Sequence, residues 1–386
     1  MDQAQIGGSL TARRFAVTAR GSAGALRLVG ARVTGQLSLT TCRFSNQDGP
    51  SVVGDGIEVS DDLAIAARSN FVADYPGGAL RLLGAKIGGQ FAFTESFLTN
   101  FGGSGINCQG AEFATGVVLR GSVLEALNET VRLISASSGG DFYVSQSTIK
   151  NPRGSNGKAV VLQSTTIAGA LRVRFADLVE RSRPARFVVD LEGTTYEGLS
   201  TEDTTLETWQ IVLRSHTDRF SAQPYQQLAK ILRESGHPAD AKKIFIQQER
   251  DRREVGANMN ARESLWHRFK GSVIGYGYLP HKAVVPFVAI LAITTFAIVG
   301  ASLIDPLVLM RPVGQSKVAC SVIEQLSFSG DIAIPLVGAG FRFQQCSLTE
   351  GPLAQTLLVA TTLLRFASWA LATLFVAGFT GLIKRD

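Results

Sequence analysis

The chain has 386 residues, of which 45% are hydrophobic and 40 are glycine, and its formal net charge is +6. This length allows about two or three structural units, and so much glycine favours a repetitive, turn-rich fold. Basic residues gather between positions 242 and 282, directly before an apolar run. A charge excess at that place indicates membrane topology, and it argues against a nucleic-acid partner.

The first 200 residues repeat one pattern, LxLxxAxVxGxLxL. The segment GALRLVGARVTGQLSL (24–39) returns as GALRLLGAKIGGQFAF (78–93). Apolar residues two apart, in short runs broken by glycine, predict strands with one inward face, and strands this short bury that face only by stacking coil on coil. We therefore predict a parallel β-helix over residues 1–200. Its coils begin at Leu26, Val52, Leu80, Ile106, Val131, Val160 and Val189.

The repeat also assigns residues to the inside, the corners and the outside of the β-helix. Recurring glycines are expected at one corner, where a positive φ or close backbone approach favours a residue without a side chain. An outward arginine in alternate coils gives a candidate basic ladder, which either binds an anionic partner or lipid headgroup or is simply a solvated face. The inward ladders are Leu28, Leu82 and Leu133, and Val33, Ile87 and Phe113; the corner glycines are Gly35, Gly89 and Gly116; the arginines are Arg27, Arg81 and Arg132.

Residues 201–272 have helical spacing and are predicted to form a helical linker module. Within 201–215, Thr204 and Glu207 form a capping box ahead of apolar residues three and four apart. Residues 224–255 predict two antiparallel helices around a turn at 235–238. Such a hairpin either closes the open end of a solenoid or binds a peptide.

Residues 273–386 contain two apolar runs and are predicted to form a transmembrane hairpin. The first run, 283–304, has 22 residues without charge, enough to cross a hydrocarbon core of about 30 Å. The second, 353–383, carries a single charge, Arg365. We expect the crossing at 364–383, with Arg365 snorkelling at one interface, and a separate lead-in segment before it.

Charges beside the runs predict the orientation. The basic residues before the first run, and Lys384 and Arg385 after the second, place both flanks in the cytoplasm by the positive-inside rule. The N-terminus lacks the pattern of a signal peptide. We therefore expect an inner-membrane protein in contact with lipid, with cytoplasmic termini and a cytoplasmic β-helix. An aromatic belt of Trp266, Phe269, Tyr276 and Tyr278 is expected at the inner interface.

Three features together carry a resemblance to a family. The repeat units are followed by GYGYLPHKA (275–283) and by a C-terminus that ends VAGFTGLIKR (376–385). In these features the chain resembles bacterial membrane proteins with pentapeptide-type β-helix repeats and a C-terminal two-span region, as a divergent relative. The resemblance implies a β-helix attached to a membrane, and its repeat motif implies no activity.

The loop between the spans is unusually apolar. Its segment LSFSGDIAIPLVGAGF (326–341) holds one acid, Asp331, together with flexible glycines. Two spans around a half-buried apolar loop are similar to the minimal pore unit of two-helix channels, where irregular backbone lines a cavity. Asp331 and Arg365 are thus candidate pore-mouth residues. The alternative is a loop that merely packs on its neighbours.

The four cysteines divide between the two regions. Cys42 and Cys108 fall at apolar positions of the repeat, as expected for free thiols in a reducing compartment. Cys320 and Cys346 lie in the outer loop, where they either form a disulfide or remain unpaired.

Catalytic motifs are missing from the sequence. None of the four histidines lies within metal-ligand spacing of another or of a cysteine, and no GxGxxG, P-loop, GxSxG or HExxH is present. We therefore expect no enzyme, with no catalytic, cofactor or metal site.

Two functions remain open. The first is a membrane pore, assembled as a homo-oligomer through small residues on the second span, with the β-helix as a sensing or assembly domain. The second is a membrane-anchored scaffold that presents the β-helix to cytoplasmic proteins without conductance. The small residues are Ser368, Ala372, Ala377 and Gly381.

Overall fold

The computed structural model describes residues 1–150, 158–174, 189–199, 205–215, 220–255, 284–313, 316–334, 346–349 and 351–379. The chain divides into two compact units, an N-terminal unit, Met1–Gly256, and a C-terminal unit, Ala257–Asp386. The helices that follow the β-helix belong to its unit, whereas the sequence predicted a separate module over 201–272. The expected aromatic belt lies outside the described residues.

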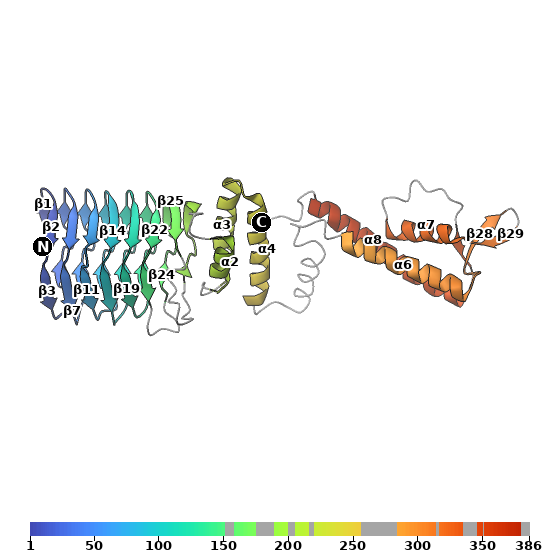
Figure 1. The fold of residues 1–386 in the computed structure, drawn as a ribbon, viewed down its shortest axis with the longest axis horizontal. Helices are drawn as coiled ribbons and strands as arrows, with labels where there is room; N and C mark the ends of the chain where they lie inside the picture. Colours follow the sequence, from blue (N-terminus) through green and yellow to red (C-terminus); the bar gives the residue numbers. More distant parts are fainter. Residues whose placement is uncertain are drawn as a thin grey trace. The chain divides into compact units, whose positions relative to one another are not determined.

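The predicted parallel β-helix is confirmed, and its strands stack into three parallel sheets (Figure 1). The seven-stranded sheet contains β4 (Leu26–Arg27), β8 (Val52–Val53), β12 (Leu80–Arg81), β16 (Ile106–Asn107), β20 (Val131–Arg132), β24 (Val160–Val161) and β26 (Val189–Asp190). The six-stranded sheet contains β3 (Ala16–Ala19), β7 (Arg43–Asn46), β11 (Asn70–Ala73), β15 (Phe97–Asn100), β19 (Val123–Ala126) and β23 (Thr148–Lys150).

The third sheet has 14 strands and includes the longest one, β25 (Thr166–Val173), which bridges its two halves. One half contains β1 (Gln5–Ile6), β5 (Arg32–Val33), β9 (Glu58–Val59), β13 (Lys86–Ile87), β17 (Glu112–Phe113) and β21 (Ser137–Ser138). The other contains β2 (Leu10–Arg13), β6 (Leu37–Thr40), β10 (Leu63–Ala66), β14 (Gln90–Thr94), β18 (Gly116–Arg120) and β22 (Phe142–Ser145), and β27 (Thr195–Leu199) pairs with β25.

The strand register reproduces the sequence repeat. The seven residues predicted to begin a coil pair consecutively along one ladder, from Leu26 to Val189. The residues of both predicted inward ladders are at most 2% exposed. Leu82 fills space beside Gly54, since a Cβ on that glycine would lie 3.0 Å from Leu82 Cδ2. Stacking of equivalent apolar positions thus builds one continuous core.

The corner glycines are explained by close approach between coils. A Cβ added to Gly35, Gly89 or Gly116 would lie 2.6, 2.2 and 2.8 Å from the neighbouring coil. A positive φ is found at Gly116 alone of the three. The expectation of one shared corner position is wrong for Gly116, because it pairs with Gln90 and therefore lies one residue along from Gly89.

Three helices follow the last coil within the part of the chain that the structure describes: α2 (Leu206–Ser215), α3 (Gln223–Glu234) and α4 (Pro238–Val255). The predicted antiparallel hairpin is confirmed by α3 and α4. Their apolar residues continue the core of the β-helix. The Gln223 side-chain amide donates to the Thr194 carbonyl at 2.8 Å, and that of Gln227 donates to the Tyr196 carbonyl at 2.6 Å. The helix α3 therefore satisfies open backbone groups of the final coil, which favours a capping role.

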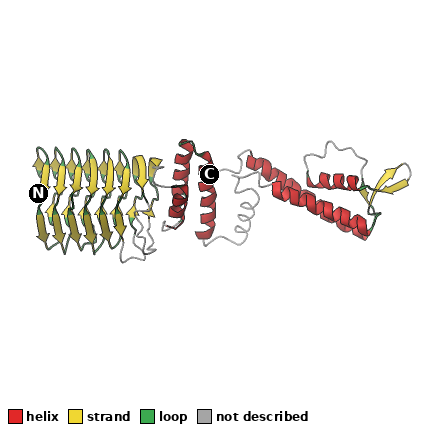
Figure 2. Cartoon of the chain, in the orientation of Figure 1, coloured by secondary structure: helices red, strands yellow, loops and turns green. Residues whose placement is uncertain are grey.

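The C-terminal unit is helical, with a small antiparallel sheet (Figure 2). In its described residues the helices are α6 (Val284–Ile304), α7 (Val322–Ala333) and α8 (Pro352–Phe379), and the strands are β28 (Leu309–Val313), β29 (Ser316–Ala319) and β30 (Ser347–Leu348). Two of the helices, α6 and α8, are long and apolar enough to cross a membrane. The first matches the predicted span.

Candidate functional site

The candidate site is the three-helix arrangement of α6, α7 and α8. The C-terminus of α6, the N-termini of α7 and α8, and strands β28, β29 and β30 share one end of the unit. We call it the disulfide end, because the structure joins Cys320 and Cys346 there by a disulfide that closes 26 residues of sequence. Of the two arrangements considered from the sequence for this cysteine pair, the structure has the disulfide.

The start of α7 is fixed beside this disulfide. Ser321 and Glu324 form a capping box, in which the Ser321 backbone N–H donates to Glu324 Oε2 at 2.7 Å. Arg311 of β28 donates to the same carboxylate. Two independent contacts therefore hold the first turn of α7. The Ser-x-x-Glu signal was present in the sequence, and the sequence reasoning above missed it.

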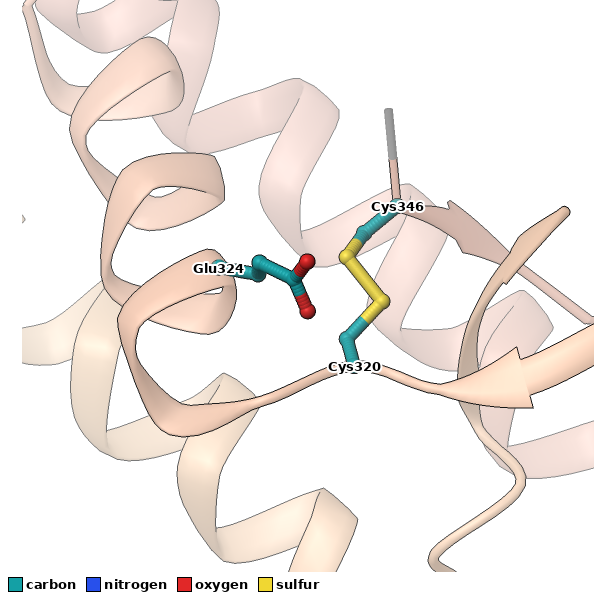
Figure 3. A group of neighbouring side chains, drawn as sticks. All are labelled: Cys320, Glu324 and Cys346. Atoms are coloured by element: carbon teal, nitrogen blue, oxygen red, sulfur yellow. A yellow bond between two sulfur atoms is a disulfide. The ribbon is translucent and has the colours of Figure 1, made fainter. Parts of the chain in front are cut away.

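Glu324 also points toward the two sulfur atoms (Figure 3). Cys320, Glu324 and Cys346 offer three possible metal-ligand atoms within 4.8 Å of one another. The sulfurs are bonded to each other, so neither is a thiolate, and Glu324 already accepts from Ser321 and Arg311. In the oxidised state these side chains do not fit a metal ion, because thiolates are the sulfur ligands that metals bind.

From the disulfide end, α7 runs back along α6. Near its start, Ser302 Oγ donates to Gln325 Oε1 at 3.1 Å. At its end, Ala333 packs in one cluster with Ile290. Since Ser302 is near the end of α6 and Ile290 near its start, α7 follows α6 for much of its length. The sequence predicted an irregular apolar loop from residue 326, but the segment up to residue 333 is helical.

The second long helix also differs from the prediction. It is one continuous helix of 28 residues, α8, so no separate lead-in segment precedes a crossing at 364–383. Its buried side recurs at intervals of three and four residues, which is the spacing of helix-packing contacts. The residues of this side are Ala354, Leu357, Thr361, Leu364, Ser368, Leu371 and Ala372.

Arg365 lies at the midpoint of α8, not near one of its ends. It is exposed, and it is flanked on the same helix by the exposed apolar side chains of Leu363, Phe366 and Trp369. About 20 Å of helix separates Arg365 from the start of α8, and its snorkelling at an interface stays a prediction.

Asp331 is likewise away from the end at which a pore mouth was expected. It is exposed on the last turn of α7, about 14 Å along that helix. Its neighbours Ile332 and Ala333 belong to two successive apolar clusters, and Leu364 packs against both clusters. Asp331 and Arg365 therefore lie at a similar level of the three-helix unit. Among the described residues, neither side chain has a hydrogen-bond or ion-pair partner.

The small residues predicted for contact between chains are used within the chain. Ser368 is fully buried, and its Oγ donates to the Ala333 carbonyl at the end of α7. Ala372, one turn further, is 6% exposed. Ser368 therefore joins α7 and α8 within one chain, and Ala372 is buried within the same chain. The Ala377 side chain and Gly381 lie outside the described part.

The predicted basic ladder exists, but its charges are neutralised. Each arginine contacts a carboxylate of its own or the preceding coil, and the hydrogen bond that Arg81 donates to Asp55 raises the pKa of Arg81. An anionic ligand would have to displace these carboxylates. The pairs are Arg27 Nε to Asp2 Oδ2 at 2.5 Å, Arg81 Nη2 to Asp55 Oδ2 at 2.5 Å, and Arg132 Nη1 to Glu129 Oε2 at 3.0 Å.

The remaining cysteines are part of the β-helix core. Cys42 and Cys108 are free and fully buried. Burial raises the pKa of the Cys108 thiol, which keeps it neutral and unreactive.

No protein-family model, curated protein or solved structure matches this chain.

Proposed function

We propose that this protein is a homo-oligomeric, cation-preferring membrane pore with a cytoplasmic β-helix. The membrane location is supported by the length of the helices. Helix α6 has 21 residues, so it is about 32 Å long, enough to span a hydrocarbon core of about 30 Å. Large apolar side chains face outward from α6 and α8, including Phe296, Leu303, Leu358 and Phe366. Such surfaces are stable against lipid and unstable against water.

The observation that carries the proposal is the direction of α7. This 12-residue helix starts at the disulfide end and stops beside Ile290, well inside the length of α6. In a membrane it would enter from one side and end within the hydrocarbon region. Backbone that leaves a helix at that depth is stable only inside protein or against a water-filled cavity. A pore between copies of α7 supplies such a cavity.

The charge of α7 favours cations in that pore. The C-terminal end of a helix carries a partial negative charge, and in α7 that end points toward the membrane interior. The basic residues between 242 and 282 support a cytoplasmic location of the β-helix, and the disulfide is consistent with a non-cytoplasmic face for the other end.

Conductance of the purified full-length protein in planar bilayers tests the proposal. We expect current steps, and a reversal potential in a KCl gradient displaced toward that of potassium. To tie the current to α7, Leu326→Cys introduces a thiol on its exposed face. The natural cysteines are buried or bonded, so a charged methanethiosulfonate reagent modifies this position alone.

The matched control is Leu363→Cys on the exposed face of α8. The reagent should reduce the current of Leu326→Cys and leave the wild type and the control unchanged. Absence of conductance, or equal block of both variants, would contradict a pore lined by α7.

The second candidate function is a scaffold without conductance, and one feature of the β-helix favours it. A groove of ≈ 480 Å³ crosses four successive coils at β13, β17, β21 and β25. Its lining combines Lys86 and Glu112 with small residues such as Gly139, which suits a protein segment. Membrane anchoring without current would favour this function.

A further inference from the structure

Two opposite charges lie on the outer surface of α7 and α8. Asp331 and Arg365 are both exposed, lie at a similar level, and have no side-chain partner among the described residues. Isolated charges in the middle of a membrane are costly, and they are normally paired or face water. Long side chains escape this cost near helix ends, but Arg365 is at the centre of a 28-residue helix.

We propose that Asp331 of one copy forms an ion pair with Arg365 of a second copy, so that each subunit contact is closed by one charge pair within the membrane. The proposal rests on the homo-oligomeric membrane assembly proposed above, and it assigns the residues that hold that assembly together. It commits to a second copy of this chain as the partner, because the complementary charge is present in the same unit.

Symmetry explains why these two residues can meet. Subunits of a membrane ring are related by rotation about an axis along the membrane normal, and such a rotation leaves every residue at its own depth. Only residues of similar depth can therefore pair between subunits. Asp331 and Arg365 meet this condition, since Leu364 packs against both apolar clusters that adjoin Asp331. The contact is head to tail, as closed rings require.

The pair is compatible with a pore along another side of α7. Leu326 and Asp331 are five residues apart on this helix, which places them about 140° apart around its axis. One side of α7 can thus face a neighbouring subunit while the other borders the central cavity. Arg pairs with carboxylates through a planar, bidentate contact, which also fixes the angle between subunits.

Cysteine cross-linking of the full-length protein tests the pair. Two copies with different affinity tags are co-expressed, one with Asp331→Cys and the other with Arg365→Cys. Cys42 and Cys108 are buried, and Cys320 and Cys346 are bonded, so mild oxidation should link the introduced positions alone. We expect a product that carries both tags. Combining Asp331→Cys with Ile293→Cys, an exposed position on α6, is the matched control and should give none.

Charge reversal provides an independent readout of the same pair. Asp331→Arg alone and Arg365→Asp alone should each abolish the oligomer in detergent, and the double variant should restore it. Restoration also shows that the variants fold. A mixed-tag product equal to that of the control, or a double variant as dissociated as the single ones, would overturn the proposal.

The cross-linking result can be distinguished from the result of the conductance measurement. A cross-linked assembly without current supports the charge pair and contradicts the conducting function. An assembly that conducts but forms no link between positions 331 and 365 contradicts the pair and leaves the pore standing. A disulfide within one chain of the Asp331→Cys, Arg365→Cys double variant would also overturn the inference.

Discussion

The two units of this protein treat their charges differently. On the β-helix, Arg27, Arg81 and Arg132 each meet a carboxylate from the same chain. In the three-helix unit, Asp331 and Arg365 meet none among the described residues. An unpaired charge costs little free energy in water and much free energy in hydrocarbon. The unpaired Asp331 and Arg365 therefore indicate a binding partner more strongly than the paired arginines of the β-helix do.

The units also differ in what stabilises them. The β-helix has one continuous core of stacked apolar positions that extends into its helical cap. The C-terminal unit has two smaller clusters and a disulfide. Damage to a core position should therefore affect the first unit most, and loss of the disulfide should affect only the second.

The largest effect is expected for Leu82→Asp. Leu82 is 2% exposed, and its ladder neighbours are Gly54 and Cys108, neither of which can pair with a carboxylate. An uncompensated buried charge costs about 3–5 kcal/mol, so neighbouring coils should unfold. The measurement is a urea titration of the full-length protein in detergent, followed by circular dichroism of the β signal.

The control for this variant is the adjacent outward position. Arg81→Leu removes a partly exposed ion pair with Asp55, and such pairs contribute about 0–1 kcal/mol. Its urea midpoint should stay close to that of the wild type. Similar losses for both variants would show that the inward and outward faces have been assigned wrongly.

A smaller effect, confined to the other unit, is expected for Cys346→Ser. The disulfide closes 26 residues of sequence, and removal of such a link costs about 2–4 kcal/mol, mainly because the unfolded chain becomes freer. Proteolysis within the segment between the two cysteines should become faster, while the urea midpoint of the β-helix should not change. Reduction of the wild type should reproduce the result. A shift in the β-helix midpoint would contradict the independence of the two units.

Sequence reasoning located the β-helix well for a physical reason. Each coil must place its own apolar residues inward, so the pattern of core positions recurs in the sequence once for every coil. The seven predicted starting residues form the observed ladder without a shift in register. Gly116 was misplaced by one position, because close approach to a neighbouring coil can be satisfied by glycine at more than one corner residue.

The three-helix unit was predicted less well, also for a physical reason. Hydropathy does not distinguish residues that face lipid from those that pack on another helix, so the run 353–383 gave no sign of where α8 begins. Its buried spacing from Ala354 to Leu371 could have shown one continuous helix. The capping box at Ser321 could have shown the start of α7. The level of Asp331 depends on how α7 packs, which no local pattern encodes.

The central claim is that α7 enters the membrane from the disulfide end and descends. Nitroxide labels on Ile323→Cys and Ile334→Cys, both exposed positions, measure this directly in reconstituted bilayers, because oxygen and a water-soluble nickel complex partition oppositely with depth. The two positions are 11 residues apart and so lie within about 20° of each other around the helix axis. We expect a clearly higher ratio of oxygen to nickel collisions at position 334 than at position 323. Equal ratios at the two positions, typical of a helix that lies along the surface, would contradict the re-entrant arrangement and with it the proposed pore.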